Sequence, residues 1–104
     1  MTYAEFWPRY LRQHSRPATR RAHVLGTTLG LLLLAGAIVG ADWRLAVAAL
    51  AVGYGAAWIS HVFVERNRPE TFSHPLWSLA SDLRMTWLSL TGRLGAELDR
   101  HGIS

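Results

Sequence analysis

Residues 24–64 read VLGTTLGLLLLAGAIVGADWRLAVAALAVGYGAAWISHVFV, and this stretch decides the fold. The first apolar run, 24–41, contains no charge, and the second, 45–64, is interrupted mainly by Ser60 and His61. Each run is long enough to cross a bilayer core of about 30 Å at about 1.5 Å of helix rise per residue. The polar or interfacial residues that separate the two runs are Asp42, Trp43 and Arg44. Because so short a connection forces antiparallel neighbours, the sequence predicts an all-α, integral membrane helical hairpin with two transmembrane helices.

Composition agrees with lipid as the solvent of the hairpin. Of the 104 residues, 50% are hydrophobic and only 17% are charged, and the apolar residues concentrate in the two runs. We expect a single membrane domain over residues 1–104. The chain has no cysteine, so a transition metal would have to be bound by imidazole and carboxylate groups. A net charge of +4 could suit nucleic acid, but the aromatic residues do not interleave with a basic stripe, and no nucleic-acid partner is expected.

Arginine placement predicts the orientation of the hairpin. All eleven basic residues are arginine, and Arg44 is the only one at the turn between the apolar runs. The others precede or follow the hairpin. By the positive-inside rule, both termini should therefore be cytoplasmic.

A helix should precede the hairpin and lie at the membrane interface. Thr2 and Glu5 have the spacing of a capping box, whereas Pro8 conflicts with a continuous helix and should kink or restart it. The apolar residues at helical spacing are Tyr3, Phe6, Trp7, Tyr10 and Leu11.

A second flanking helix should follow the hairpin. Residues 65–73 are polar and contain Pro69, which indicates a loop, and Pro75 suits the first position of a helix that runs towards Gly92 or beyond. Asp82 and Arg84 favour a helix that lies on the membrane or packs against the hairpin, although its apolar stripe also leaves a third span open.

Histidines gather where both apolar runs reach the predicted cytoplasmic surface. His23 lies 20 residues before Trp43 and His61 lies 18 residues after it, so the two imidazoles differ in depth by only about 3 Å. His14 and His74 belong to segments that return to the same surface. One interpretation is that interfacial histidines are only polar tips at the headgroup boundary. The other, which depth matching favours, is a metal site whose ligands are His14, His23, His61 and His74.

Acidic and arginine side chains near these histidines complete the candidate site. Glu65 and Asp82 are the candidate catalytic residues, since each could orient a ligating imidazole by accepting its second N–H. His101 is assigned no role in the site. Four arginines could either be positive-inside signals or bind a substrate carboxylate, and these are Arg20, Arg21, Arg66 and Arg68.

Four blocks of sequence together resemble one known family. They are Phe6-Trp7-Pro8-Arg9-Tyr10-Leu11 with His14, Arg20-Arg21-Ala22-His23 with Gly26-Thr27, Trp58 with His61 and Phe63, and residues 65–79 with Asp82 beyond. The chain is similar, from about Phe6 to Arg84, to the small membrane family of Fe(II)-dependent 2-hydroxy fatty acid dioxygenases. That family is typified by a fungal α-oxidation enzyme and includes bacterial relatives that were long known only as a domain of unknown function.

The resemblance implies a function and a cellular location. By position, the same four histidines would bind ferrous iron, the substrates would be O2 and a 2-hydroxy fatty acid, and the product acid would be one carbon shorter. Membrane lipid would surround the chain in the bacterial inner (cytoplasmic) membrane, and a homo-oligomer is possible. Two alternatives from other classes remain: a haem-binding electron carrier that uses His23 and His61 as axial ligands, and a non-catalytic membrane scaffold.

Overall fold

A computed structural model describes residues 1–103 of the chain, and these residues form helices and loops without a strand. The five α-helices are α1 (Tyr3–Arg12), α2 (Pro17–Gly40), α3 (Trp43–Ser60), α4 (Pro75–Leu90) and α5 (Leu94–Arg100). A π-helical turn, η1 (His61–Glu65), continues α3, and a short 3-10 turn, η2 (Glu70–Phe72), precedes α4. The all-α prediction is therefore confirmed.

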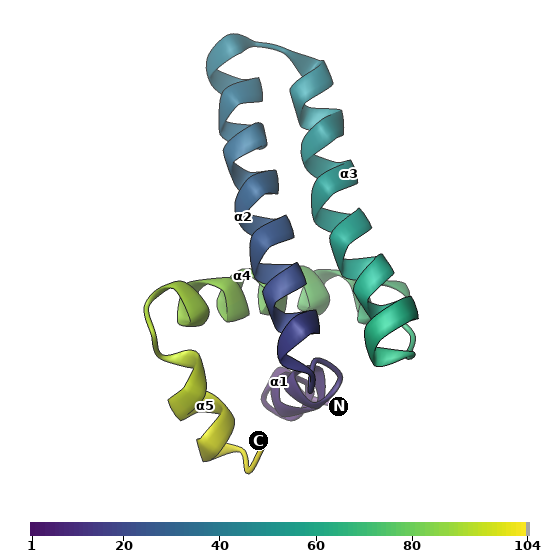
Figure 1. Cartoon of the computed structure of the whole chain (residues 1–104), viewed down its shortest axis with the longest axis vertical. Coiled ribbons are helices and arrows are strands. Elements are labelled where there is room, and N and C mark those ends of the chain that lie inside the picture. The colour runs from purple at the N-terminus through teal and green to yellow at the C-terminus, as the bar shows by residue number, and fades with distance from the viewer. Residues whose placement is uncertain (104) are drawn as a thin grey trace.

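Helices α2 and α3 form the predicted antiparallel hairpin (Figure 1). Its turn is shorter than expected, because Trp43 already belongs to α3 and only Ala41 and Asp42 connect the helices. Ala41 adopts a left-handed conformation with φ of 50°, and the Asp42 side chain accepts a hydrogen bond of 3.0 Å from the backbone N–H of Arg44. These two features end one helix and cap the next.

Small residues let the two long helices approach closely. A Cβ atom placed on Gly26 would lie 2.6 Å from the Cβ of Ala56, and one placed on Gly30 would lie 3.1 Å from the carbonyl oxygen of Ala49. Both distances are shorter than normal van der Waals contacts, so this crossing requires glycine.

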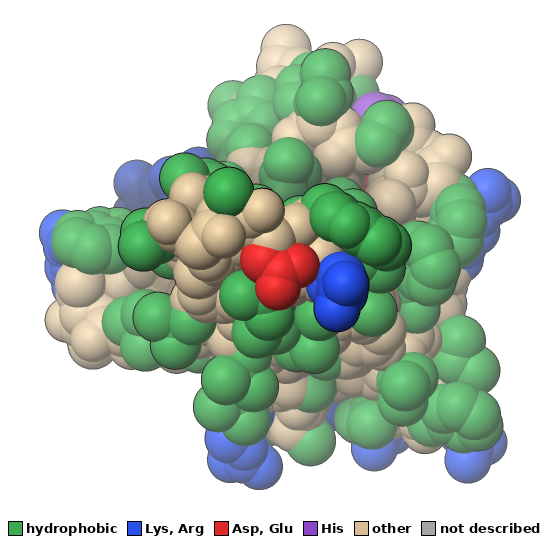
Figure 2. All heavy atoms as spheres, turned by 90° about the horizontal axis from the view of Figure 1, so that it is seen from above, with side chains coloured by type: hydrophobic (Ala, Val, Ile, Leu, Met, Phe, Trp, Pro, Cys, Tyr) green, Lys and Arg blue, Asp and Glu red, His purple; other side chains and the backbone are tan. Residues whose placement is uncertain are grey.

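The hairpin exposes apolar side chains in the manner of a membrane protein. Helix α2 and the helical stretch Trp43–Glu65 are long and apolar enough to cross a membrane, and only 22% of each apolar window is buried. A core helix of a soluble protein would be mostly buried. Seen from the turn, hydrophobic side chains cover most of the face, and most arginines lie around its edge (Figure 2).

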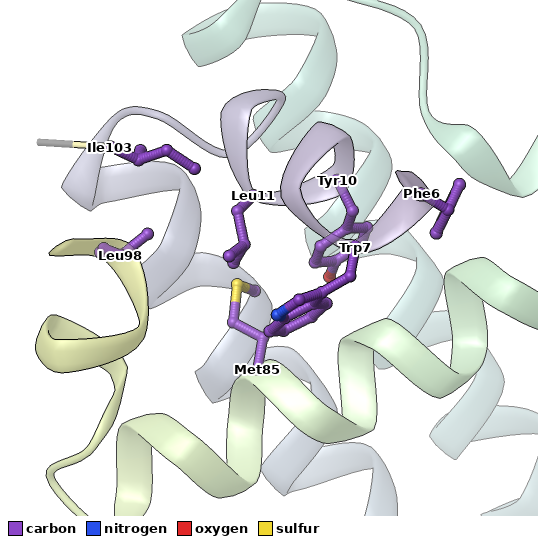
Figure 3. Close-up of a cluster of buried hydrophobic side chains, with 7 residues drawn as sticks. All are labelled: Phe6, Trp7, Tyr10, Leu11, Met85, Leu98 and Ile103. Atoms are coloured by element: carbon purple, nitrogen blue, oxygen red, sulfur yellow. The ribbon is translucent and has the colours of Figure 1, made fainter. Parts of the chain in front are cut away.

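The remaining helices gather at the open end of the hairpin. Helix α4 crosses α2 at a steep angle beside the open-end half of the hairpin, and α1 and α5 lie nearer the open end (Figure 1). The apolar face of α1 does not point outward, because it packs on α4 and α5 in a buried cluster (Figure 3). The members of this cluster are Phe6, Trp7, Tyr10, Leu11, Met85, Leu98 and Ile103. Helix α4 thus connects this cluster to the side of the hairpin, because it packs on α1 and α5 and on α2.

Two details of α1 explain how this cluster is held. The capping box is confirmed, since Thr2 and Glu5 exchange hydrogen bonds at the start of the helix. The restart of the helix expected at Pro8 does not occur: α1 continues through it, although proline has no N–H to donate to the carbonyl of Ala4. On the other face, the Trp7 indole donates a 2.8 Å hydrogen bond to Glu97 in α5, which lowers the pKa of Glu97 to about 2.

Candidate metal centre

Three of the four predicted histidine ligands meet at the open end of the hairpin. His14 lies in the turn after α1, His23 lies in the second turn of α2, and His61 is the first residue of η1. All three side chains are at most 3% exposed. The Nε2 atom of His14 lies 3.2 Å from that of His23 and 3.0 Å from that of His61. The sequence prediction that His23 and His61 share one depth is confirmed by this contact of both with His14.

Local structure explains why these imidazoles converge. Arg16 precedes α2 in an extended conformation and Pro17 occupies its first position, so the chain leaves the end of α1 and starts a new helix between His14 and His23. At the other helix, α3 changes to the π-helical turn at His61. Such turns occur often at functional sites because they change the direction in which a side chain points.

The outer nitrogen of each ring faces a hydrogen-bond acceptor. Nδ1 of His14 lies 2.7 Å from the backbone oxygen of Tyr10, and Nδ1 of His61 lies 2.6 Å from Oδ1 of Asn67. Nδ1 of His23 lies 3.3 Å from Oδ1 of Asp82, which is within ion-pair distance but not aligned for a hydrogen bond. Acceptors at Nδ1 place the proton on that nitrogen and leave the lone pair on Nε2.

This arrangement fits a bound cation. Neutral rings protonated at Nδ1 present only lone pairs where their Nε2 atoms meet, and two lone pairs repel each other unless a proton or a metal ion lies between them. A proton on His14 is disfavoured, because burial, and then the neighbouring His23 and His61, hold its pKa well below the usual value. A metal ion would satisfy all three nitrogens together.

The distances also suit metal coordination. Two nitrogen ligands that bind one ion at about 2.1 Å and at right angles lie about 3.0 Å apart. The two Nε2 separations at His14 are 3.0 and 3.2 Å. Imidazole binds iron, zinc, copper and nickel, so the cluster of His14, His23 and His61 can hold a transition metal and leave further coordination positions open.

The structure does not bring His74 into this cluster. Its Nδ1 atom lies 3.1 Å from Oε2 of buried Glu70, and its ring stacks on Trp77 at an interplanar angle of 7°. Glu70 also binds Arg9 at 3.0 Å. His74 caps the start of α4 and is oriented by these contacts, so the structure places it at the open end but outside the three-histidine cluster.

The two predicted acidic residues have different positions. Glu65 does not contact an imidazole, because its carboxylate accepts hydrogen bonds from the Ser15 hydroxyl at 3.2 Å and from the Arg16 backbone N–H at 2.6 Å. It caps the start of α2 and ties it to the end of the π-helical turn. Asp82 does lie beside His23, and the Tyr10 hydroxyl donates a short hydrogen bond to it.

The four predicted arginines lie around the cluster rather than in it. Arg20 donates hydrogen bonds to the backbone oxygens of His14 and Ser15, at 2.8 and 3.0 Å. Arg21, Arg66 and Arg68 are exposed, and the guanidinium of Arg68 lies over the ring of Phe72. Arg20 therefore supports the backbone of His14, a member of the three-histidine cluster.

Sequence reasoning gave no role to two residues that contact the cluster. Asn67 accepts from His61 and donates to the backbone oxygen of Gln13 at 3.1 Å, and Tyr10 contacts both Asp82 and the ring of His14. The sequence offered a weak indication of the role of Asn67, because this single amide side chain follows His61 by six residues. It offered none for Tyr10, because Tyr10 fits the apolar face of α1.

Fold and site together define a small helical-hairpin protein with membrane-type helices and a buried three-histidine cluster suited to a metal ion. The family model described as 2-hydroxy-palmitic acid dioxygenase Mpo1-like matches residues 1–94, and the chain belongs to this family. No curated protein and no solved structure matches the chain.

Proposed function

We propose that this chain is an Fe(II)-dependent dioxygenase that shortens 2-hydroxy fatty acids by one carbon at the cytoplasmic surface of the membrane. The observation that carries the proposal is the convergence of three buried Nε2 atoms, with the second ring nitrogens of His14 and His61 held by hydrogen-bond acceptors and that of His23 beside Asp82. The family's description, which names a 2-hydroxy acid, supports the substrate class.

The reaction balances without a further reductant. A 2-hydroxy acid, R-CHOH-COOH, and O2 give R-COOH, CO2 and water. The bond between C1 and C2 breaks, C2 is oxidised to the new carboxyl carbon, C1 leaves as CO2, and O2 takes up the electrons. Neither a flavin nor a nicotinamide is needed.

The residues of the chain would bind and orient the reactants. Ferrous iron held by three imidazoles would supply the redox chemistry and still have positions for a hydroxyl, a carboxylate and oxygen. His14, His23 and His61 would hold the ion, and Asp82 would orient His23. Arg21, Arg66 and Arg68, which are exposed near the cytoplasmic end, would attract the carboxylate.

The geometry disfavours haem. Axial ligands of one haem lie on opposite sides of the porphyrin, about 4 Å apart, with the macrocycle between them. The rings of His23 and His61 lie only 5.1 Å apart between centroids, and His14 contacts the Nε2 atoms of both, so no space for a porphyrin is left between them.

Iron loading and product analysis test the proposal. Purified protein loaded anaerobically with ferrous iron should, when oxygen is admitted, convert 2-hydroxypalmitate to the fifteen-carbon acid, measured by mass spectrometry. Palmitate without the hydroxyl should be a poor substrate, because it cannot form the chelate that fixes C2. Zinc should bind without supporting turnover.

Histidine variants separate the site from the reaction. Alanine at His14, His23 or His61 should each lower bound iron, whereas His101→Ala should not. If iron is retained at one ion per chain but no 2-hydroxy acid of any length is consumed, the metal site stands and the reaction is rejected.

A further inference from the structure

A groove in the hairpin leads away from the histidine cluster. It has a volume of about 330 Å³, and α2, α3 and α4 each contribute a wall. Apart from Asp82 at its cytoplasmic end, its lining is mostly apolar. Its limits are marked by Thr27 and Leu34 on α2, Ala46 and Tyr54 on α3, and Leu79 and Leu83 on α4.

The groove faces of both long helices continue into the metal-site histidines. Thr27 follows His23 by four residues, and Tyr54 precedes His61 by seven, spacings that keep side chains on one face of a helix. On α4, Leu79 and Leu83 flank Asp82 on one face, and Asp82 lies 3.3 Å from His23. A molecule in the groove would therefore have one end at the cluster.

We propose that this groove holds the hydrocarbon tail of the substrate acid and limits its chain length. This inference rests on the proposed function, which places the carboxyl and hydroxyl groups of the acid at the cluster. The polar end of the acid then lies beside Asp82, and its tail extends between α2 and α3 towards the turn. Helix α4 covers one side of the tail.

Two measures of size agree with an alkyl chain. From Tyr54 to Ala46 the groove spans eight residues of helix, about 12 Å. Extended carbon chains with bonds of about 1.5 Å advance roughly 1.3 Å per carbon, so about nine carbons fit along it. If a methylene takes about as much space as a water molecule, roughly 30 Å³, the volume holds about eleven. A tail of this length fills the groove, and carbons beyond this length gain no further contact with its walls.

Ala46 offers a direct test at the far end of the groove. Ala46→Phe should shorten the groove by about one helical turn, or roughly four carbons. We expect the kcat/KM ratio of twelve-carbon over eight-carbon 2-hydroxy acids to fall at least tenfold, because the carbons beyond C2 of the longer acid fill the full groove and exceed the shortened one, whereas those of the shorter acid fit both. Ala51→Phe is the matched control, because Ala51 is exposed on the same helix outside the groove, and it should leave the ratio unchanged. If Ala46→Phe and Ala51→Phe have the same kcat/KM ratio for the two acids, the groove does not limit chain length.

Photolabelling tests occupancy without turnover. A 2-hydroxy acid with a diazirine at carbon 10 is bound to the iron-loaded protein in nanodiscs, irradiated, and mapped by mass spectrometry. We expect labels on groove residues near Leu34 and Ala46, and loss of these labels with excess unlabelled 2-hydroxy acid. Labels spread over the outer face, or equally competed by phospholipid, would overturn the tail site. The tail site would also be overturned if the protein formed a stable dimer in which a second copy fills the groove and prevents labelling.

The two readouts separate the inference from the function on which it rests. Competed groove labels in a protein that turns over no acid would reject the reaction and keep the tail site. If the protein turns over the acid but shows no groove labels, and Ala46→Phe does not change the chain-length selectivity, the reaction is kept and the tail site is rejected.

Discussion

Each clustered imidazole is oriented by a different kind of acceptor. A backbone carbonyl holds His14, a carboxylate lies beside His23, and an amide oxygen holds His61. Only the backbone carbonyl that accepts from His14 would remain if the residue that provides it were substituted. Asn67 matters most among the side chains, because its amide also donates to Gln13 and so connects the end of the π-helical turn to the end of α1.

Removal of the Asn67 amide should weaken metal binding. In Asn67→Ala, the buried Nδ1–H of His61 loses its acceptor, and we expect iron affinity to fall about 10-fold to 100-fold, measured by competition with a chelator. Asn67→Asp, which keeps an acceptor oxygen, should recover most of the loss. An alanine variant with unchanged affinity and an intact fold by circular dichroism would show that Asn67 does not position His61.

At the level of elements, the hairpin sets the distance between two of the three clustered histidines. His23 belongs to α2 and His61 follows α3, and the glycine-mediated crossing at Gly26 lies within one turn of His23. Helix separation at this crossing would therefore move the two imidazoles apart. The π-helical turn adds a second adjustment, because it changes the direction of His61 at the end of α3.

A single methyl group at the crossing should disturb the site. In Gly26→Ala, the new Cβ would meet that of Ala56 at 2.6 Å, about 1 Å closer than normal contact, so the helices must separate. We expect a loss of about 1–3 kcal/mol in stability and at least a tenfold loss in iron affinity. Gly55→Ala is the control, since its Cβ would meet nothing within 4 Å. Equal iron affinity in the two variants would contradict this coupling.

At the level of the whole molecule, the chain separates into two regions. The hairpin exposes its apolar side chains, whereas the buried aromatic cluster, the histidine cluster and both termini lie at its open end (Figure 1). The α1–α4–α5 cluster packs like the core of a small soluble protein. We infer that this end lies outside the bilayer and faces the cytoplasm, where the flanking arginines should be.

Cysteine labelling would establish the orientation, and the natural chain has no cysteine to interfere. Ser73→Cys, which is exposed at the open end, should react with a membrane-impermeant maleimide in inside-out vesicles and not in right-side-out ones. Arg44→Cys, exposed at the turn, should give the opposite result. Labelling of both cysteines from one side would reject the spanning hairpin, and a reversed pattern would reject the orientation.

The sequence by itself determined the hairpin and the depth of its histidines. Uninterrupted apolar runs joined by a short polar turn allow only antiparallel helices, and the constant rise per residue converts spacing into depth. For the same reason, His23 and His61 could be placed at one level before any packing was known. The capping box at Thr2 and Glu5 could also be predicted from the sequence, because it depends only on residues three positions apart.

Only the tertiary structure decided which groups meet at that level. Rotation about a helix axis and the paths of the loops depend on packing between distant segments, so depth alone could not exclude His74 or assign Glu65 to the start of α2. Asp82 reaches His23 only because α4 crosses beside α2, and Tyr10 reaches Asp82 only because α1 packs on α4. Sequence spacing along one helix carries no information about such crossings, because a crossing is fixed by the side chains of both partners.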